Sequence, residues 1–212
     1  YAGTVRDAFH KAVELDPRNV EARFSLLEYY LMAPAIAGGG KGKAKDLVRD
    51  TAAVSPPASQ LMQAQLDIGE DQYAKAEAAI LAVQPGNDEA VADRQRDLLT
   101  TLGQIHLKEK RYADSERLFA LVQKRFPDSE TGFYGQGRLL QEQGRHRDAI
   151  AAYERALGIA DLASTHYRIA QVAQALGDKA RAAAEFNKAL TVKTALHPKL
   201  REDAQSQLKA LR

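Results

Sequence analysis

The sequence predicts an all-α fold in which short helices, joined by tight turns, form a row of similar helical hairpins. Strong helix formers such as alanine and leucine dominate the chain, and proline and glycine are confined to a few places between helical segments. Within those segments, apolar residues recur at spacings of three and four, whereas the alternating β-branched runs of strands are missing. A small–aromatic–small pattern also returns at intervals of 33 and 34 residues.

This recurring pattern defines the second helix of each hairpin. A spacing of four and then three places its members on one helix face, where the small residues let a neighbouring helix approach and the ring fills the gap beside them. The three clearest examples are Ser115-Phe119-Val122, Ala149-Tyr153-Ala156 and Ala182-Phe186-Ala189. A further small residue, Gly103, Gly137 or Ala170, lies twelve positions before each of them and marks the first helix of the same hairpin.

The first small position of each pattern fixes the order of the elements. It falls at Val5, Ala44, Ala76, Ser115, Ala149 and Ala182, so the successive gaps are 39, 32, 39, 34 and 33 residues. The two long gaps predict an inserted turn in one repeat and an extended first helix in another. The predicted segments are 1–17 (second helix of a truncated repeat), 18–56 (repeat with the inserted turn), 57–87 (repeat), 88–128 (repeat with the extended first helix), 129–161 and 162–195 (repeats), and 196–212 (capping helix).

The capping helix is predicted from one apolar stripe. Leu200, Ala204, Leu208 and Leu211 share a face, and charged residues occupy the rest of the segment. Such a helix covers the apolar side of a terminal repeat and keeps it away from water.

The pattern resembles the tetratricopeptide repeat, a family of helix–turn–helix units of about 34 residues. The matching residues are Leu102-Gly103, Tyr112, Ser115, Phe119 and Pro127 in one unit, Phe133, Gly137, Leu140, Gly144, Ala149, Tyr153 and Ala156 in the next, and Ile169, Ala170, Gly177, Ala182, Phe186 and Ala189 in a third. No unit has the signature tryptophan. The resemblance implies a right-handed α-solenoid whose first helices line a concave groove, and it implies a scaffold that binds a protein or peptide partner there.

The residues of that groove are carried over from the family's first-helix positions. They are polar, amide-rich and tyrosine-bearing, which suits an extended peptide because tyrosines anchor it and amides bond its backbone. The predicted partner-binding residues are Thr100, Gln104, Lys108, Thr131, Tyr134, Arg138, Gln141, Tyr167 and Gln171.

The stretch APAIAGGGKGKAKD, residues 33–46, is the one segment that resembles a phosphate-binding loop. A Walker A motif would need glycine where Ala37 stands and a hydroxyl where Ala44 stands, so a nucleotide site is not predicted. The repeat register instead predicts an enlarged turn, like one found in some bacterial members of the family. Glycine amides and lysines at a helix start leave open an anion site or small-molecule site at Gly39, Gly40, Lys41 and Lys43.

The remaining residues show no motif for catalysis, cofactor binding, nucleic-acid binding or membrane insertion. The chain has no cysteine, no histidine pair with metal-ligand spacing and no nucleophile motif, so we expect neither an enzyme nor a metal or other cofactor. A net charge of +2 without a basic cluster argues against nucleic acid as a partner. No apolar run approaches the roughly 18 residues of a membrane span, so direct membrane insertion is not expected.

The origin of the chain leaves an alternative open. It begins with Tyr1, so we expect a trimmed piece whose preceding segment is a signal, a lipid anchor or another domain. The absence of cysteine favours the bacterial periplasm over the cytoplasm. The alternative function is therefore a non-catalytic helical domain of a larger protein. The sequence gives neither the identity of the partner nor an oligomeric state.

Overall fold

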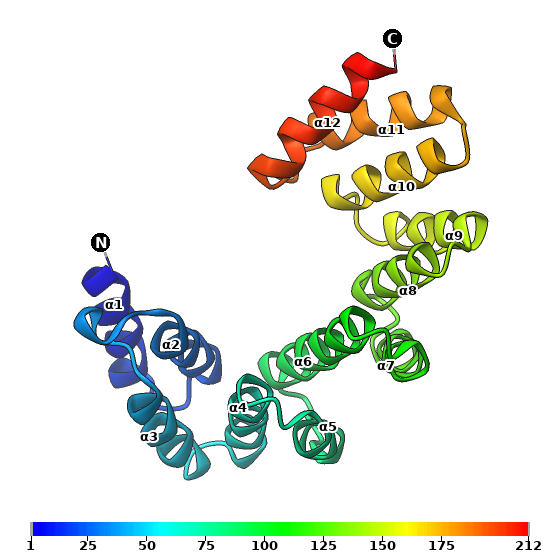
Figure 1. Ribbon diagram of the computed structural model, residues 1–212. Coiled ribbons are helices and arrows are strands. Elements are labelled where there is room, and N and C mark those ends of the chain that lie inside the picture. The colour runs from blue at the N-terminus through cyan, green and yellow to red at the C-terminus, as the bar shows by residue number, and fades with distance from the viewer. Residues whose placement is uncertain (1, 212) are drawn as a thin grey trace. The chain divides into compact units, whose positions relative to one another are not determined.

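The computed structural model describes residues 2–211, and their side chains from residue 6 onward. The all-α prediction is confirmed, because residues 2–211 form helices and turns without a strand (Figure 1). In chain order the elements are α1 (Ala2–Leu15), α2 (Val20–Met32), the 3-10 turn η1 (Ala35–Ala37), α3 (Lys41–Ala52), α4 (Pro56–Gly69), α5 (Tyr73–Ala82), α6 (Glu89–Lys108), α7 (Tyr112–Arg125), α8 (Thr131–Glu142), α9 (His146–Leu157), α10 (Ala163–Ala175), α11 (Lys179–Thr191) and α12 (Pro198–Ala210).

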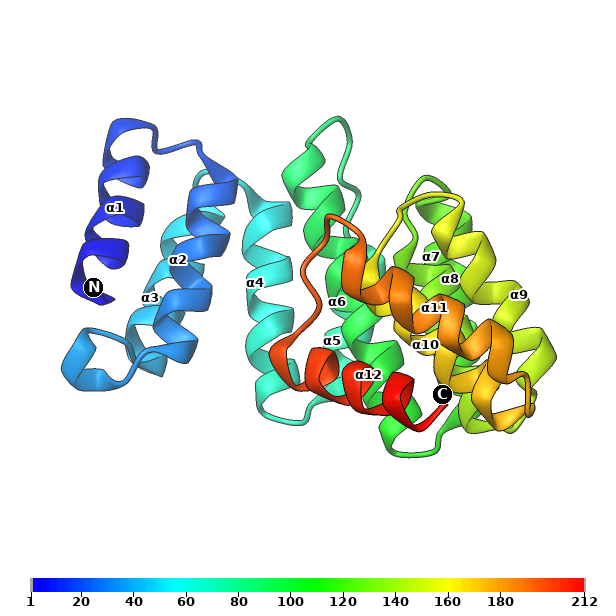
Figure 2. The same ribbon diagram turned by 90° about the horizontal axis from the view of Figure 1, so that it is seen from above.

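The chain divides into two compact units between Leu102 and Gly103, a point that lies within α6. In the N-terminal unit, α2 packs against α1, α3 and α4, and α4 also packs against α3 and α5. In the C-terminal unit, each helix from α7 to α12 packs against the next one along the chain. Figure 2 shows the same succession of helices from a second direction. The repeat boundaries predicted above stay a prediction, and the side chain of Val5 lies outside the described ones.

The core of the C-terminal unit is built from rings packed against small residues. Phe119 and Tyr153 are fully buried, as the repeat pattern predicts. A Cβ atom on Gly135 would lie 2.3 Å from the Phe119 ring, and one on Gly137 would lie 2.5 Å from the Tyr153 ring. Glycine is therefore required at both positions, because any side chain there would overlap a ring that has no space to move into.

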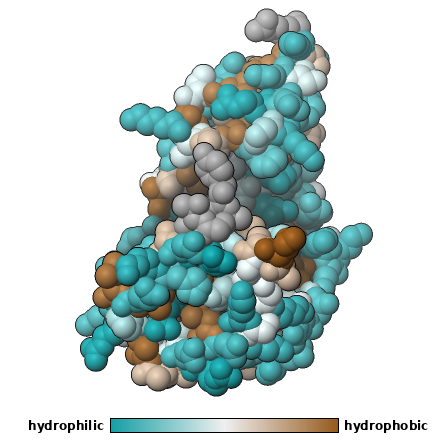
Figure 3. Space-filling model, turned by 90° about the vertical axis from the view of Figure 1, so that its left-hand side faces the viewer, coloured by the Kyte–Doolittle hydropathy of each residue, from teal (hydrophilic) through white to brown (hydrophobic). Residues whose placement is uncertain are grey.

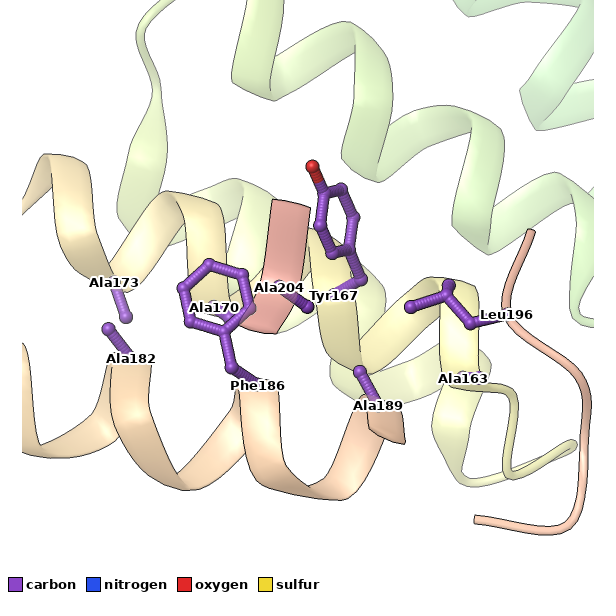
Figure 4. Close-up of a cluster of buried hydrophobic side chains, with 9 residues drawn as sticks. All are labelled: Ala163, Tyr167, Ala170, Ala173, Ala182, Phe186, Ala189, Leu196 and Ala204. Carbon is purple, nitrogen blue, oxygen red and sulfur yellow. The ribbon is translucent and has the colours of Figure 1, made fainter. Parts of the chain in front are cut away.

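The last hairpin and α12 share one apolar cluster (Figure 4). Phe186 of α11 lies among alanine side chains and meets Tyr167 edge to face, with ring centroids 5.8 Å apart. Ala204 of α12 is fully buried in the same cluster, and the three leucines of its stripe pack around it. The predicted capping helix is thus confirmed: α12 covers the final repeat.

In four hairpins the turn between the two helices has the same backbone conformation and hydrogen bond. The second residue after the first helix has a positive φ, and the next amide donates to a carbonyl five residues back, which closes the helix end. The residue with positive φ is Asp71, Lys110, Gly144 or Gly177, and each lies five positions before the first small residue of the following helix. Glycine marks two of these turns in the sequence, whereas Asp71 and Lys110 take the same conformation without that signal.

Hydrophobic residues are scattered over the surface. The face in Figure 3 is mostly hydrophilic, with hydrophobic residues in separate spots. Among residues 6–211, large apolar side chains that stay exposed are few: Leu15, Leu31, Met32, Ile36, Ile159 and Leu176. Three of these six belong to α2 and to the turn that follows it.

Candidate partner-binding face

The predicted groove residues of α8 lie on one side of the helix and are partly exposed. Tyr134, Arg138 and Gln141 are each half-buried, one helical turn apart. The glycines that receive the rings of α7 and α9, Gly135 and Gly137, lie to either side of this row. The core therefore uses the rest of the helix and leaves this polar side for other contacts.

Tyr134 is held in place by its neighbours. Its ring centroid lies 5.7 Å from that of Tyr153, with the rings tilted by 54°. The Tyr153 hydroxyl donates to Gln141 Oε1 at 2.8 Å, which also fixes the Gln141 side chain. Burial raises the pKa of Tyr153, with a smaller contribution from Tyr134. These contacts give Tyr134 and Gln141 defined positions on the α8 surface.

Arg168 of α10 continues this polar side. Burial alone would lower the pKa of Arg168, but its interaction with the Tyr134 hydroxyl and with two further tyrosines outweighs burial, so the pKa is raised. Its Nη1 donates to Gln171 Oε1 at 3.1 Å. Arg138, by contrast, takes part in no hydrogen bond or ion pair among the described residues. The guanidinium of Arg138 is thus available to a partner.

Tyr167 is placed differently from the other predicted residues. Only 3% of it is exposed, because α12 covers it. Its hydroxyl donates to Asp203 Oδ2 at 2.6 Å and accepts from Gln171 Nε2 at 3.0 Å. Burial and the carboxylate of Asp203 raise the pKa of Tyr167 to about 12. Tyr167 therefore supports the face from beneath and does not present its ring to a partner.

Asp203 and Gln207 of α12 extend the network beyond α10. Gln207 donates to Asp203 Oδ1 at 3.3 Å, and Gln174 donates to Gln207 Oε1 at 2.9 Å. Polar side chains thus connect α8, α10 and α12, and we call this set the polar seam. It consists of Tyr134, Gln141, Arg168, Gln171, Gln174, Asp203 and Gln207, together with Arg138, which lies beside Tyr134 and Gln141 on α8.

Reasoning from the sequence missed the α12 part of this seam. Asp203 and Gln207 are separated by one helical turn and lie on the same side of Ala204 of the apolar stripe. Their carboxylate and amide side chains lie beside the core-facing stripe of the helix, and this position was the sequence signal that could have indicated their part in the seam. Arg168, which follows Tyr167 directly, was missed because it matches none of the groove positions of the repeat.

The four other predicted residues occupy varied surroundings. Thr131 is half-buried, and its hydroxyl lies 2.9 Å from Ser129 Oγ. Gln104 and Lys108, at the end of α6, are exposed. Thr100 belongs to the N-terminal unit, is 9% exposed, and its hydroxyl has no hydrogen-bond partner among the described residues. A role in partner binding stays a prediction for all of them.

The glycines of residues 33–40 close the connection between α2 and α3. The Gly39 amide donates to the Pro34 carbonyl at 3.2 Å, and the Gly40 amide donates to the Tyr30 carbonyl at 2.8 Å. A Cβ on Gly39 would lie 1.9 Å from the Ala33 carbonyl oxygen, so only glycine fits there. Both amides have backbone partners, one in the turn and one in α2, and an anion would have to displace them.

The two lysines of the predicted anion site also have partners. Lys43 Nζ donates to the Gly38 carbonyl at 2.9 Å, and Lys41 Nζ lies 3.7 Å from Glu70 Oε1. Anion binding at Gly39, Gly40, Lys41 and Lys43 stays a prediction, as does the likeness of this turn to one found in bacterial relatives. Among residues 2–211, no group of three or more possible ligands could hold a metal ion, and no helix has the length and apolar character to cross a membrane.

Comparisons with known proteins agree with this architecture. Residues 134–199, which run from α8 to the start of α12, match the family model for the tetratricopeptide repeat. The chain is similar to yeast Tom70, with a TM-score of 0.73 and 14% identity over 97% of this chain and 42% of that one. It is also similar to a tetratricopeptide repeat protein from Parabacteroides merdae ATCC 43184, with a TM-score of 0.56 and 19% identity over 97% of this chain and 76% of that one.

A third similar structure is that of Cut9 with Hcn1, a hetero-tetramer of APC/C, with a TM-score of 0.60 and 13% identity over 100% of this chain and 39% of that one. At these identities the likeness shows the fold. No curated protein matches the sequence. The family match is limited to residues 134–199, and the structural likeness shows an α-helical solenoid fold for the chain.

Proposed function

We propose that this chain of tetratricopeptide repeats is a non-catalytic scaffold that holds an extended peptide segment of a protein partner on the polar seam. The observation that carries the proposal is the arrangement of α8 and α10. Their small and aromatic residues build the core, while Tyr134, Gln141 and Gln171 remain at the surface in fixed positions and Arg138 lies beside them on α8. The family match covers the same helices, and the similar Cut9 structure contains a protein partner, Hcn1.

The chemistry of the seam suits a peptide backbone. Gln141 and Gln171 offer amide groups that both donate and accept, and Tyr134 offers a rigid ring with a hydroxyl. A tyrosine that its neighbours already hold loses little conformational freedom on binding, so it makes an efficient anchor. Arg138 supplies an unused guanidinium for a carbonyl or carboxylate of the partner.

The test removes polar groups and leaves the packing in place. The variant Tyr134→Phe/Arg138→Gln keeps the ring against Tyr153 but loses the hydroxyl and the free charge. We expect capture of partner proteins from native lysate, quantified by mass spectrometry, to fall at least tenfold for the specific partners. The matched control Tyr112→Phe/Arg147→Gln makes the same chemical changes away from the seam, and capture should not change. Equal recovery by both variants at wild-type helicity would reject the polar seam as the binding site.

A further inference from the structure

The N-terminal unit has two neighbouring hollows along the exposed side of α2. The first has a volume of about 310 Å³ and lies between α2 and the beginning of α6. The second has a volume of about 400 Å³ and follows the end of α2 into the next turn. Ser25 lines both, so the two hollows lie next to each other along the helix.

The first hollow is acidic. Four carboxylates line it, from Glu21 on α2 and from Glu89, Asp93 and Asp97 on α6. Glu21 and Glu89 take part in no ion pair among the described residues. The extended start of α6 supplies this wall: α6 has 20 residues, whereas α8 has 12. The insertion that the repeat spacing reveals thus adds negative charge to the surface.

The one cation that lines this hollow is already used. Arg94 Nη1 lies 2.6 Å from Glu28 Oε1, and its guanidinium stacks on the Phe24 ring, 4.6 Å from the centroid. Its side chain is only 14% exposed. The nearby Arg96 forms ion pairs with Asp93, at 2.6 Å between Nη1 and Oδ1, and with Asp97, at 3.0 Å between Nη2 and Oδ1. Both arginines are occupied, and the charges of Glu21 and Glu89 stay uncompensated.

The second hollow is apolar. Phe9 from α1, Tyr29 and Met32 from α2, and Pro34 from the following turn line most of it. Met32 is 85% exposed although it borders a concave surface. Burying such a side chain against a partner is favourable, at roughly 25 cal/mol per Å² of apolar area removed from water.

From these two hollows we infer a second docking surface, for a basic amphipathic peptide segment of a protein partner. A lysine or arginine of the segment lies in the acidic hollow between Glu21 and Glu89, and an apolar side chain of the segment lies against Tyr29 and Met32. The α2 residues that line the two hollows are centred about five positions apart, or about 8 Å along the helix. A segment in the polyproline II conformation spans about 9 Å in three residues and places its first and fourth side chains on one face. The negative wall selects this occupant, because nucleic acid and anionic membrane would both be repelled.

This surface is independent of the polar seam. Its residues all belong to the N-terminal unit, and it shares none with the seam proposed above. One surface can fail its test while the other passes.

The probe is a fluorescein-labelled dodecapeptide with three copies of Lys-Ser-Ser-Leu, whose lysine and leucine match the separation of the hollows. Fluorescence anisotropy at low salt should show binding, and replacing every lysine by glutamate or every leucine by serine should weaken it at least tenfold. The variant Glu21→Gln/Glu89→Gln should weaken binding about fivefold, in line with two exposed charge pairs. Met32→Ser should weaken it about threefold. The matched control Glu14→Gln/Asp50→Asn removes two exposed carboxylates of the same unit outside both hollows, and it should bind like the wild type.

Three results would overturn the inference. The first is equal affinity of the glutamate and lysine peptides. The second is unchanged peptide affinity in the hollow variants when circular dichroism shows wild-type helicity. The third is binding to vesicles of phosphatidylcholine and phosphatidylglycerol that Met32→Ser abolishes, because this would assign the apolar hollow to a membrane surface.

Discussion

Replacing Gly137 by alanine tests the packing rule on which the repeats are built. The added Cβ would lie 2.5 Å from Tyr153 Cδ1 and Cε1, about 1 Å closer than an ordinary contact. Tyr153 is fully buried and bonded to Gln141, so its ring cannot retreat without cost. Overpacking of this size costs about 3 kcal/mol, and alanine returns about 1 kcal/mol through its higher helix propensity. We expect Gly137→Ala to lower the free energy of unfolding by about 2 kcal/mol.

The matched control is Gly42→Ala. Gly42 also lies in a helix, α3, but a Cβ there would meet nothing within 4 Å. The same substitution should therefore stabilise the protein by about 0.5 kcal/mol through propensity alone. Urea unfolding followed by circular dichroism at 222 nm measures both variants, with each transition fitted separately because repeat units can unfold in steps.

A double-mutant cycle separates steric overlap from other effects of Gly137→Ala. In a Tyr153→Leu background the ring is gone, so adding alanine at position 137 should cost little or even stabilise. The coupling energy between the two sites should be about 2 kcal/mol. If Gly137→Ala were as stable as the wild type, or if its cost were the same in both backgrounds, the idea that this glycine exists to admit the ring would be refuted.

Three further predictions follow from the turns and from the seam. Lys110→Gly should raise the free energy of unfolding by about 0.5 kcal/mol because it relieves a positive φ, and Gly144→Ala should lower it by about 1 kcal/mol for the opposite reason; urea titration measures both. The pKa of Tyr167 is raised to about 12 in the folded protein, so its contribution to the free energy of unfolding is complete below pH 10 and is lost as the pH rises through about 12. A Tyr167→Phe variant should therefore lose less stability than the wild type between pH 9 and pH 11.5. Phosphate should not raise the melting temperature, because Lys41, Lys43 and the turn amides already have partners; a shift that Lys41→Ala/Lys43→Ala removes would restore the anion site.

The repeats could be predicted from the sequence because their signal is local. A small residue, a ring four positions later and a small residue three after that all lie within two turns of one helix, so spacing alone identifies the buried face. Phe119, Tyr153 and Phe186 are fully buried as predicted. The turn at Lys110 lacks the glycine that would signal it, yet the spacing to the next small residue is the same as at Gly144.

The binding face was predicted less well, because it depends on which helix packs over which. Tyr167 occupies a groove position within its own repeat, but α12 covers it and binds its hydroxyl through Asp203. Spacing within α10 cannot reveal this, since the covering residues lie more than thirty positions away. The acidic hollow was missed for the same reason: Glu21 and Glu89 come together only through tertiary packing.

The position of Tyr167 also indicates how α12 serves the fold. A helix that only shielded the last repeat from water would need an apolar side and a polar side. It would not need residues at the border of the two sides that make hydrogen bonds to the neighbouring helix. In α12, Asp203 and Gln207 lie at the border of the apolar stripe and continue the hydrogen bonds of Gln171 and Gln174. The helix therefore occupies the place of a first helix of a further repeat, with polar groups that face the same way as those of α10. For the proposed scaffold, the cap then extends the surface offered to a partner as well as closing the core.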